Sequence, residues 1–307
     1  GRNEITARFE VGFPAFGRTI NSGELIRIFF DFLPGCVENV FFYRRQNNAE
    51  IKKRITLADD QHFIRNELKR LDLVSFVADG SILPRETGVS DRPMKGSVAF
   101  HSPDSLRITL NLPGHGPISG MAIHRGITLI VGGGYHGKST LLKALESGVY
   151  NHIPGDGREY VITDETAVKL RAEDGRSINH VDISLFIRDL PNKKDTTCFS
   201  TADASGSTSQ AAAVIESIEA GTRAFLIDED TSATNFMLRD DLMQRIVSRD
   251  KEPITPFIER ARDLYKQAGI STVLVAGSSG AYFFIADTII QMDAYRPFDI
   301  TEMVKNA

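Results

Sequence analysis

The stretch Ile127-Thr-Leu-Ile-Val-Gly-Gly-Gly-Tyr-His-Gly-Lys-Ser-Thr-Leu-Leu142 decides the fold of this 307-residue chain. An apolar run rich in β-branched residues enters a glycine cluster, and an amphipathic segment, Thr140 to Glu146, follows it. This order predicts a strand, a tight loop and a helix. From Gly132 to Ser139 the loop matches the phosphate-loop pattern in full: glycine, any four residues, then glycine, lysine and serine.

The spacing of this phosphate loop (residues 132–139) suits contact with the phosphates of a nucleotide. Glycines let main-chain N–H groups approach anionic oxygens, and the helix that begins near Lys138 points its positive end at the same place. We expect Lys138 to reach the β- and γ-phosphates and the Ser139 hydroxyl to bind Mg²⁺. The alternative is a glycine-rich turn without a ligand. The predicted ATP-binding residues are Gly132, Gly133, Gly134, Tyr135, His136, Gly137, Lys138, Ser139 and Thr140.

The composition is that of an ordinary soluble globular protein, with 41% hydrophobic and 25% charged residues. A net charge of -4 gives no overall basic surface, so any contact with nucleic acid must come from a local patch. The two cysteines, Cys36 and Cys198, suggest neither a disulfide framework nor a metal cluster. No apolar run is long enough to span a bilayer, and the two cysteines fit a reducing compartment, so we expect a soluble intracellular protein. The short interval after the phosphate loop, described below, argues against a membrane partner. The chain begins at Gly1 rather than Met, which suggests that its start is truncated.

A second group of candidate residues follows the apolar run Ala224-Phe-Leu-Ile227. Asp228 and Glu229 come directly after it, and the end of a buried parallel strand faces the ligand crevice of such folds. We therefore expect Asp228 to hold Mg²⁺ and Glu229 to polarise the attacking water, with Glu229 and Lys138 as the catalytic residues. The alternative is a strand that ends in a solvated acidic turn.

The motifs together resemble an ATP-binding cassette. Beyond the phosphate loop, the similarity is strongest to one family, the predicted ABC-class ATPases, and it extends over nearly the whole chain. The stretches that carry it are Ala204-Ser-Gly-Ser-Thr-Ser-Gln-Ala-Ala212, Asp228-Glu-Asp-Thr-Ser-Ala-Thr-Asn-Phe-Met237, Glu252-Pro-Ile-Thr-Pro-Phe257, Val11-Gly-Phe-Pro-Ala15 and Ile82-Leu-Pro-Arg85.

The resemblance implies a shared ATP site. In cassette proteins two subunits pair head to tail, and each ATP lies between the phosphate loop of one and the signature helix of the other. Ser205 lies 23 residues before Asp228 (228 minus 205), the spacing of a cassette signature. Carried over, Ser205, Gly206 and Ser207 contact the γ-phosphate in trans, although an ordinary helix cap also explains these residues.

The sequence departs from a cassette at four positions. Ala204 stands where the signature usually has leucine, and Asp230 stands where a proline is usual. No glutamine occurs between Ser139 and Ser209, where cassettes usually have one. The position of the switch histidine is occupied by Gly-Ser-Ser-Gly, so Ser278 and Ser279 are the candidate switch residues, through their hydroxyls. The interval from Lys138 to Ser205 is also short for a cassette that docks on a transporter, so we expect no transporter subunit.

The N-terminal third has no motif of its own. A region rich in glycine and proline at 79–97 places the expected boundary after residue 96, with an α+β domain over 1–96 and an α/β ATPase domain with a mostly parallel sheet over 97–307. A basic cluster lies in the first domain and is either a solvated surface or a site for phosphate backbones. Its residues are Arg44, Arg45, Lys52, Lys53 and Arg54.

These observations favour a Mg²⁺-dependent ATPase that binds ATP and ADP. We expect it to dimerise around ATP and so to move an attached domain. The sequence is also similar to the family member associated with kinetoplastid mitochondrial RNA editing, which implies RNA as a partner and the mitochondrion as the compartment. Two rivals remain open. A small-molecule phosphotransferase also needs a phosphate loop but no Ser205, and an ATP-controlled assembly module binds ATP with negligible turnover.

Overall fold

The computed structural model describes residues 6–239, 252–277 and 279–306 and divides the chain into two compact units, Gly1–Ile55 and Thr56–Ala307. The division falls within helix α3 (Asn48–Arg70), whereas the glycine- and proline-rich region predicts it after residue 96. The reason is strand pairing: β3 (Leu73–Ala78) is hydrogen-bonded to β5 (Gly116–His124), so segments on both sides of residue 96 share one sheet.

The first unit consists of a short hairpin and a helical arm. The strands are β1 (Ala15–Phe16) and β2 (Thr19–Ile20); the helical segments are α1 (Ser22–Arg27), a π-helical turn η1 (Ile28–Phe32), α2 (Leu33–Phe41) and η2 (Tyr43–Arg45). Asn21 caps the start of α1, since its Oδ1 accepts from the Glu24 N–H at 3.2 Å. Pro34 does not end the helical run: it lies in the first turn of α2, directly after the π-helical turn η1, and the helical segments continue from Ser22 to Phe41.

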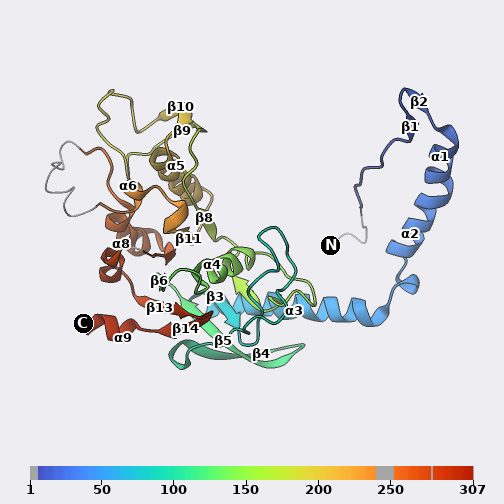
Figure 1. Ribbon diagram of the computed structural model, residues 1–307, viewed down its shortest axis with the longest axis horizontal. Coiled ribbons are helices and arrows are strands. Elements are labelled where there is room, and N and C mark those ends of the chain that lie inside the picture. The colour runs from blue at the N-terminus through green and yellow to red at the C-terminus, as the bar shows by residue number, and fades with distance from the viewer. Residues whose placement is uncertain (1–5, 240–251, 278, 307) are drawn as a thin grey trace. The chain divides into compact units, whose positions relative to one another are not determined.

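The second unit is built around a six-stranded sheet with the order β14-β13-β6-β12-β11-β8 (Figure 1). All neighbouring pairs are parallel except β13 with β14. This confirms the expected α/β fold with a mostly parallel sheet. The strands are β6 (Ile127–Val131), β8 (Val168–Leu170), β11 (Ala224–Asp228), β12 (Ser271–Val275), β13 (Thr288–Asp293) and β14 (Arg296–Asp299).

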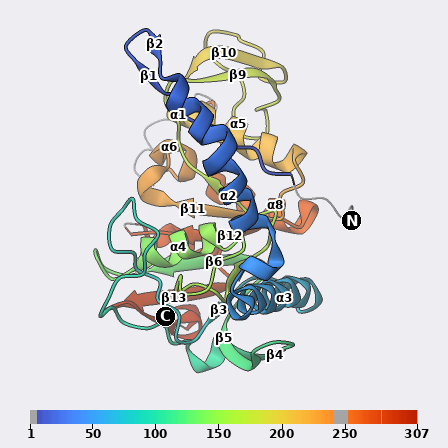
Figure 2. The ribbon, with the colours of Figure 1, turned by 90° about the vertical axis from the view of Figure 1, so that its right-hand side faces the viewer.

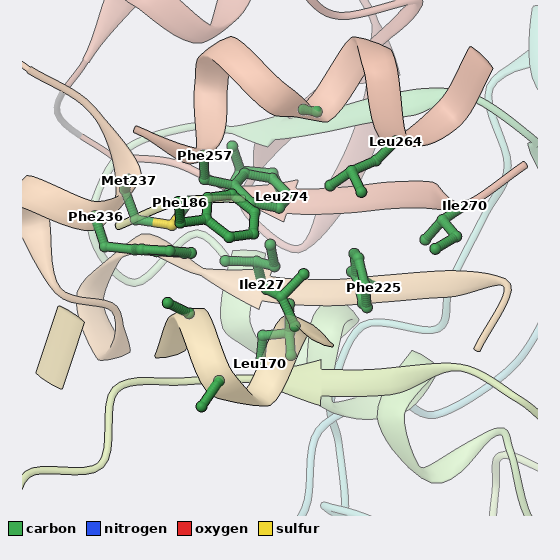
Figure 3. Packing of buried hydrophobic residues seen from close by; sticks show 14 of the residues in the cluster. Leu170, Phe186, Phe225, Ile227, Phe236, Met237, Phe257, Leu264, Ile270 and Leu274 are labelled. Atoms are coloured by element: carbon green, nitrogen blue, oxygen red, sulfur yellow. The ribbon is translucent and has the colours of Figure 1, made fainter. Parts of the chain in front are cut away.

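Alternate residues of the central strands are buried in two different cores. Phe225 and Ile227 of β11 pack with α8 (Phe257–Ala268) on one face of the parallel sheet. Figure 3 shows this core. Leu226 of the same strand packs on the other face with α4 (Lys138–Ser147). Because successive side chains of a strand point in opposite directions, the continuous apolar run read in the sequence fills both faces.

A second sheet covers α4. Its four antiparallel strands have the order β4-β5-β3-β7, with β4 (Arg107–Leu112) and β7 (Val161–Thr163) at the edges. Ile64 and Leu68 of α3 pack on the face of this sheet that is turned away from α4. The second unit is therefore layered as α3, antiparallel sheet, α4, parallel sheet and α8.

The signature region is carried by a hairpin and a helix rather than by a helical subdomain. Strands β9 (Arg176–Val181) and β10 (Phe199–Ala204) pair antiparallel and lead directly into α5 (Gly206–Glu219), and Figure 1 shows this group beside β8. The remaining elements are η3 (Asp104–Leu106), η4 (Glu229–Thr231), α6 (Thr234–Met237), η6 (Gly280–Phe284) and α9 (Thr301–Lys305). Within the described ranges, no helix is both long and apolar enough to cross a membrane.

The aromatic cluster around Phe257 gives a test of this packing. Phe257 is 1% exposed, and its ring lies 6.2–6.4 Å from the rings of Phe186, Phe225 and Phe236. We expect Phe257→Ala to lower the free energy of unfolding by about 3–5 kcal/mol, because the cavity cannot close fully. Urea denaturation measures the change, with Phe284→Ala, at a position 92% exposed, as the matched control that should change little.

Candidate functional site

The phosphate loop turns sharply between β6 and α4. Gly132 has φ +142°, and a Cβ there would meet the Met292 carbonyl oxygen at 2.3 Å, so only glycine fits. Gly137 has φ +97° and caps the start of α4. The predicted strand, loop and helix are therefore present, and the main-chain N–H groups at the start of α4 are positioned for an anion.

Lys138 bends back over the phosphate loop. Its Nζ donates to the carbonyl oxygens of Gly132 at 2.7 Å and Gly133 at 2.8 Å. These two carbonyls hold the ammonium group beside the cradle where the phosphates of a nucleotide fit. Gly133, Gly134 and Tyr135 are exposed, Tyr135 by 99%, whereas Gly137 is buried. His136 contacts the turn after β13 through Nδ1, which accepts from the Ala294 N–H at 3.0 Å.

Ser139 and Asp228 meet at the carboxyl ends of the sheet. The Ser139 hydroxyl donates to Asp228 Oδ2 at 3.2 Å, although 89 residues separate the two along the chain. Strand β12 lies between β6 and β11 and brings the two ends together. A hydroxyl oxygen and a carboxylate oxygen are hard ligands of the kind that Mg²⁺ prefers, and Mg²⁺ completes its shell with waters and phosphate oxygens. The pair therefore fits the predicted ion.

Glu229 follows immediately, at the start of η4. Its Oε2 accepts from the Gly277 N–H at 2.9 Å, which ties it to the loop after β12. Of the two candidate switch residues in that loop, Ser279 accepts from the Ala281 N–H at 3.2 Å, and Ser278 lies outside the described residues.

Tyr282 is a neighbour of Glu229 that sequence reasoning missed. It is 1% exposed, and within the described ranges its hydroxyl has no hydrogen-bond partner. Burial, and then the negative charge of Glu229, raises the pKa of Tyr282, so it stays a neutral donor. Nothing in the run Ala281-Tyr-Phe-Phe-Ile285 distinguishes this tyrosine from an ordinary core aromatic residue.

The three predicted signature residues differ in accessibility. Ser205 is exposed at the N-terminal end of α5, and its hydroxyl lies 2.9 Å from Thr208 Oγ1. Gly206 and Ser207 are buried, and the Ser207 hydroxyl donates to Asn235 Oδ1 at 2.6 Å. Of the three, Ser205 is thus the residue whose side chain can reach a ligand brought by another molecule.

Gln210 joins the signature helix to the loop that follows the two acids, a contact that the sequence did not indicate. It is fully buried; its Nε2 donates to Ser232 Oγ and its Oε1 accepts from the Ala233 N–H, both at 3.0 Å. Ser232 Oγ in turn donates to the Asp228 carbonyl at 2.9 Å. The N-terminal end of α5 and the end of β11 are therefore held as one block.

The basic cluster lies in the first unit, away from these motifs in the sequence. Arg44 and Arg45 are in η2, and Lys52, Lys53 and Arg54 are in α3; all five are exposed. The structure therefore places the five side chains in solvent on two consecutive helical segments.

The six-stranded sheet, the phosphate loop and the acids at the end of β11 define a P-loop nucleotide-binding protein. Residues 47–307 match the P-loop domain of the ABC ATPase family, and residues 1–44 match the N-terminal region of ATPases of the ABC class. The chain therefore belongs to the ABC-class ATPases.

The chain spans half the length of a curated relative that it matches. The chain is 31% identical to the uncharacterized protein MJ1628 of Methanocaldococcus jannaschii over 229 residues, which are 72% of this chain and 50% of that protein.

Among solved structures, the chain is similar to cbiO1 from Clostridium perfringens, part of the ABC transporter complex cbiONQ. The identity is 14% and the TM-score is 0.45, over 76% of this chain and 91% of that one. MJ1267, an ATP-binding cassette of an ABC transporter in its ADP conformation, is 12% identical with a TM-score of 0.40, over 65% and 91%. Likenesses this low say nothing about what the chain acts on.

The Gln210 contact gives a test of the block that links α5 to β11. We expect Gln210→Leu to lower the free energy of unfolding by about 0.5–1.5 kcal/mol, because it removes the hydrogen bond to the half-buried Ala233 N–H. Chemical denaturation measures the loss. Ser217→Ala is the matched control on the same helix, since the Ser217 hydroxyl only bonds back to the Ala213 carbonyl. Equal stability of the two variants would contradict the assignment.

Proposed function

We propose that the protein hydrolyses ATP to ADP and phosphate with Mg²⁺, at a site completed by a second copy of the chain. The observation that carries the proposal is the contact of Ser139 with Asp228 at 3.2 Å, with Glu229 as the next residue. A site that only bound a nucleotide needs the phosphate loop, whereas a carboxylate beside the metal-binding pair is suited to activating water.

Each residue of the proposed site has a separate role in hydrolysis. Ser139 and Asp228 would hold Mg²⁺, which would neutralise negative charge on the phosphates when bound. Lys138 exchanges its two carbonyl acceptors in the phosphate loop for phosphate oxygens, which are stronger acceptors because they are charged. Glu229 orients a water molecule and accepts its proton while the water oxygen bonds to the γ-phosphorus and the bond to the β–γ bridging oxygen breaks. The Gly277 N–H fixes the Glu229 carboxylate for this role.

The proposed dimer is supported by the position of Ser205. Its side chain is exposed, and both views show α5 separated from α4, which carries the phosphate loop (Figures 1 and 2). This position supports a contribution of Ser205 to the γ-phosphate of another copy, where the N-terminal end of α5 adds its partial positive charge.

The role of Glu229 is tested by Glu229→Gln. We expect this variant to bind ATP normally and to hydrolyse it about 10²- to 10⁴-fold more slowly, because the amide cannot accept the proton. Phosphate release and ATP titration measure the two properties. Glu219→Gln, at an exposed position of α5, is the control and should retain full turnover. Near-normal hydrolysis by Glu229→Gln would refute the assignment and favour a phosphotransferase or an assembly module.

The shared site is tested by the molar mass of Glu229→Gln in solution. We expect a monomer without nucleotide and a dimer with Mg²⁺-ATP, because the slow variant accumulates the ATP-bound state. Adding Ser205→Arg should keep ATP binding and abolish the shift, since the long cationic side chain blocks the partner's phosphates. A mass that stays monomeric with saturating ATP would exclude the dimer.

An RNA role is proposed as a second function and rests on the first unit. Four consecutive exposed residues, Phe42 to Arg45, combine two aromatic rings with two guanidinium groups, and the Arg44 guanidinium carbon lies 5.5 Å from the centre of the Phe42 ring. Exposed rings that stack bases beside cations that pair with phosphates are typical of single-strand binding. The mitochondrial compartment implied by the resemblance belongs to this same proposal.

Filter binding with oligo(U) at several salt concentrations tests the RNA role. We expect retention at low salt, and we expect the double change Arg44→Ala with Arg45→Ala to weaken it. The salt slope should fall by about 0.7 for each phosphate that the variant no longer neutralises. The matched control removes two exposed cations of the second unit, Lys193→Ala with Lys194→Ala. The absence of retention by the unchanged protein at low salt would remove the RNA role.

A further inference from the structure

A hollow of about 600 Å³ lies beside β14 in the second unit (the β14 hollow). One wall is the segment 99–107, which leads through η3 into β4, and the other is β14 itself. The side chains that matter most are Phe298, 48% exposed, and Arg296, which makes no ion pair with any described residue. The β14 hollow thus offers an aromatic face and an available cation.

The same two walls reach the phosphate loop. Tyr295, directly before β14, donates its N–H to the His136 carbonyl at 3.1 Å. Its ring lies against Gly137, where an added Cβ would come within 2.7 Å of Tyr295 Cδ1. On the other wall, Phe100 lines a small space with Gly137, Thr140 and Tyr295, while the neighbouring residues of the segment line the β14 hollow. The β14 hollow is therefore next to the start of α4.

The strand order indicates over which strands the two ends of the bound nucleotide lie. The γ-phosphate end is marked by Asp228 and Glu229 at the end of β11, which lies beyond β12 on one side of β6. Strands β13 and β14 lie on the other side of β6. Because the loop holds the phosphates in a row, with the α- and β-phosphates on its main-chain N–H groups, the nucleoside leaves toward β13 and β14.

We propose that the β14 hollow holds the nucleoside of the bound nucleotide, with Tyr295 beside the ribose, the base stacked on Phe298 and Arg296 bonded to the acceptor atoms of the base. The proposal rests on the proposed nucleotide site and adds the part of that site that binds the nucleoside. Arg107 and Ser105 are not available for the base, since Arg107 bonds to Ser102 and Asp104 and the Ser105 hydroxyl donates to Asp299 Oδ2 at 2.7 Å. His101 lines the same hollow, and its Nε2 lies 3.0 Å from Arg107 Nη2, so we assign recognition to stacking on Phe298 and to Arg296.

Inorganic tripolyphosphate separates the nucleoside site from the phosphate site, because it fills the loop without a base. We expect Phe298→Ala to weaken ATP binding about tenfold in isothermal titration and to leave tripolyphosphate binding unchanged. Tyr150→Ala, which removes an aromatic ring 74% exposed elsewhere in the second unit, is the matched control and should change neither. Equal ATP affinity of Phe298→Ala and the unchanged protein would overturn the proposal.

Lys138→Ala distinguishes this failure from a failure of the proposed function. It should weaken ATP and tripolyphosphate together, since it acts on the phosphates alone. If Lys138→Ala weakens both ligands while Phe298→Ala weakens neither, the nucleotide site stands and the β14 hollow is excluded as its nucleoside part. If Lys138→Ala changes neither, the phosphate site is wrong, and the nucleoside assignment falls with it.

The absence of tryptophan from the sequence allows a direct readout. Phe298→Trp places a single indole in the β14 hollow and keeps a stacking surface. We expect ATP to change its fluorescence and tripolyphosphate to leave it unchanged. Tyr150→Trp is the matched reporter and should respond to neither. An equal response of Phe298→Trp to both ligands, or to neither while titration shows ATP bound, contradicts the placement of the base.

Discussion

The parallel pairing of β6, β12 and β11 is the constraint on which the site depends. Parallel strands end at the same edge of a sheet, so the pairing of the strands brings residues that are far apart in the sequence close together at that edge. Ser139 and Asp228 are joined in this way across the intervening strand. The loop before α4 and the loops after β11 and β12 then supply an anion cradle, a pair of hard oxygen ligands and a fixed carboxylate.

Two buried cores hold this edge rigid. The alternating side chains of β11 are divided between α4 on one face and α8 on the other, so a movement of the strand disturbs both cores at once. Gln210 extends the rigidity to α5 through Ser232 and Ala233. In the proposed function, a ligand that contacts the N-terminal end of α5 acts on a block that already includes the end of β11, which gives a physical route from the proposed shared site to Asp228 and Glu229.

The first unit is different in character. No described residue of α1, η1 or α2 is buried, and large apolar side chains such as Phe30 and Phe32 are mostly exposed. Such a segment gains little from a core of its own, whereas Thr56–Ala307 contains all three hydrophobic clusters. The stable scaffold and the nucleotide site thus belong to one unit, and the exposed aromatic and basic residues belong to the other.

The sequence by itself determined the local features: the loop from Gly132 to Ser139, the apolar strand that delivers Asp228 and Glu229, and the cap at Asn21. Each depends on backbone freedom, periodicity or side-chain chemistry within a few residues, which a sequence displays directly. Long-range proximity is different, because it depends on which strands pair. Only the tertiary structure decided that β3 pairs with β5, which moves the domain boundary into α3. It also decided which side chains surround the site: Tyr282 lies near Glu229, Gln210 joins α5 to the loop after β11, and Tyr295 packs on Gly137.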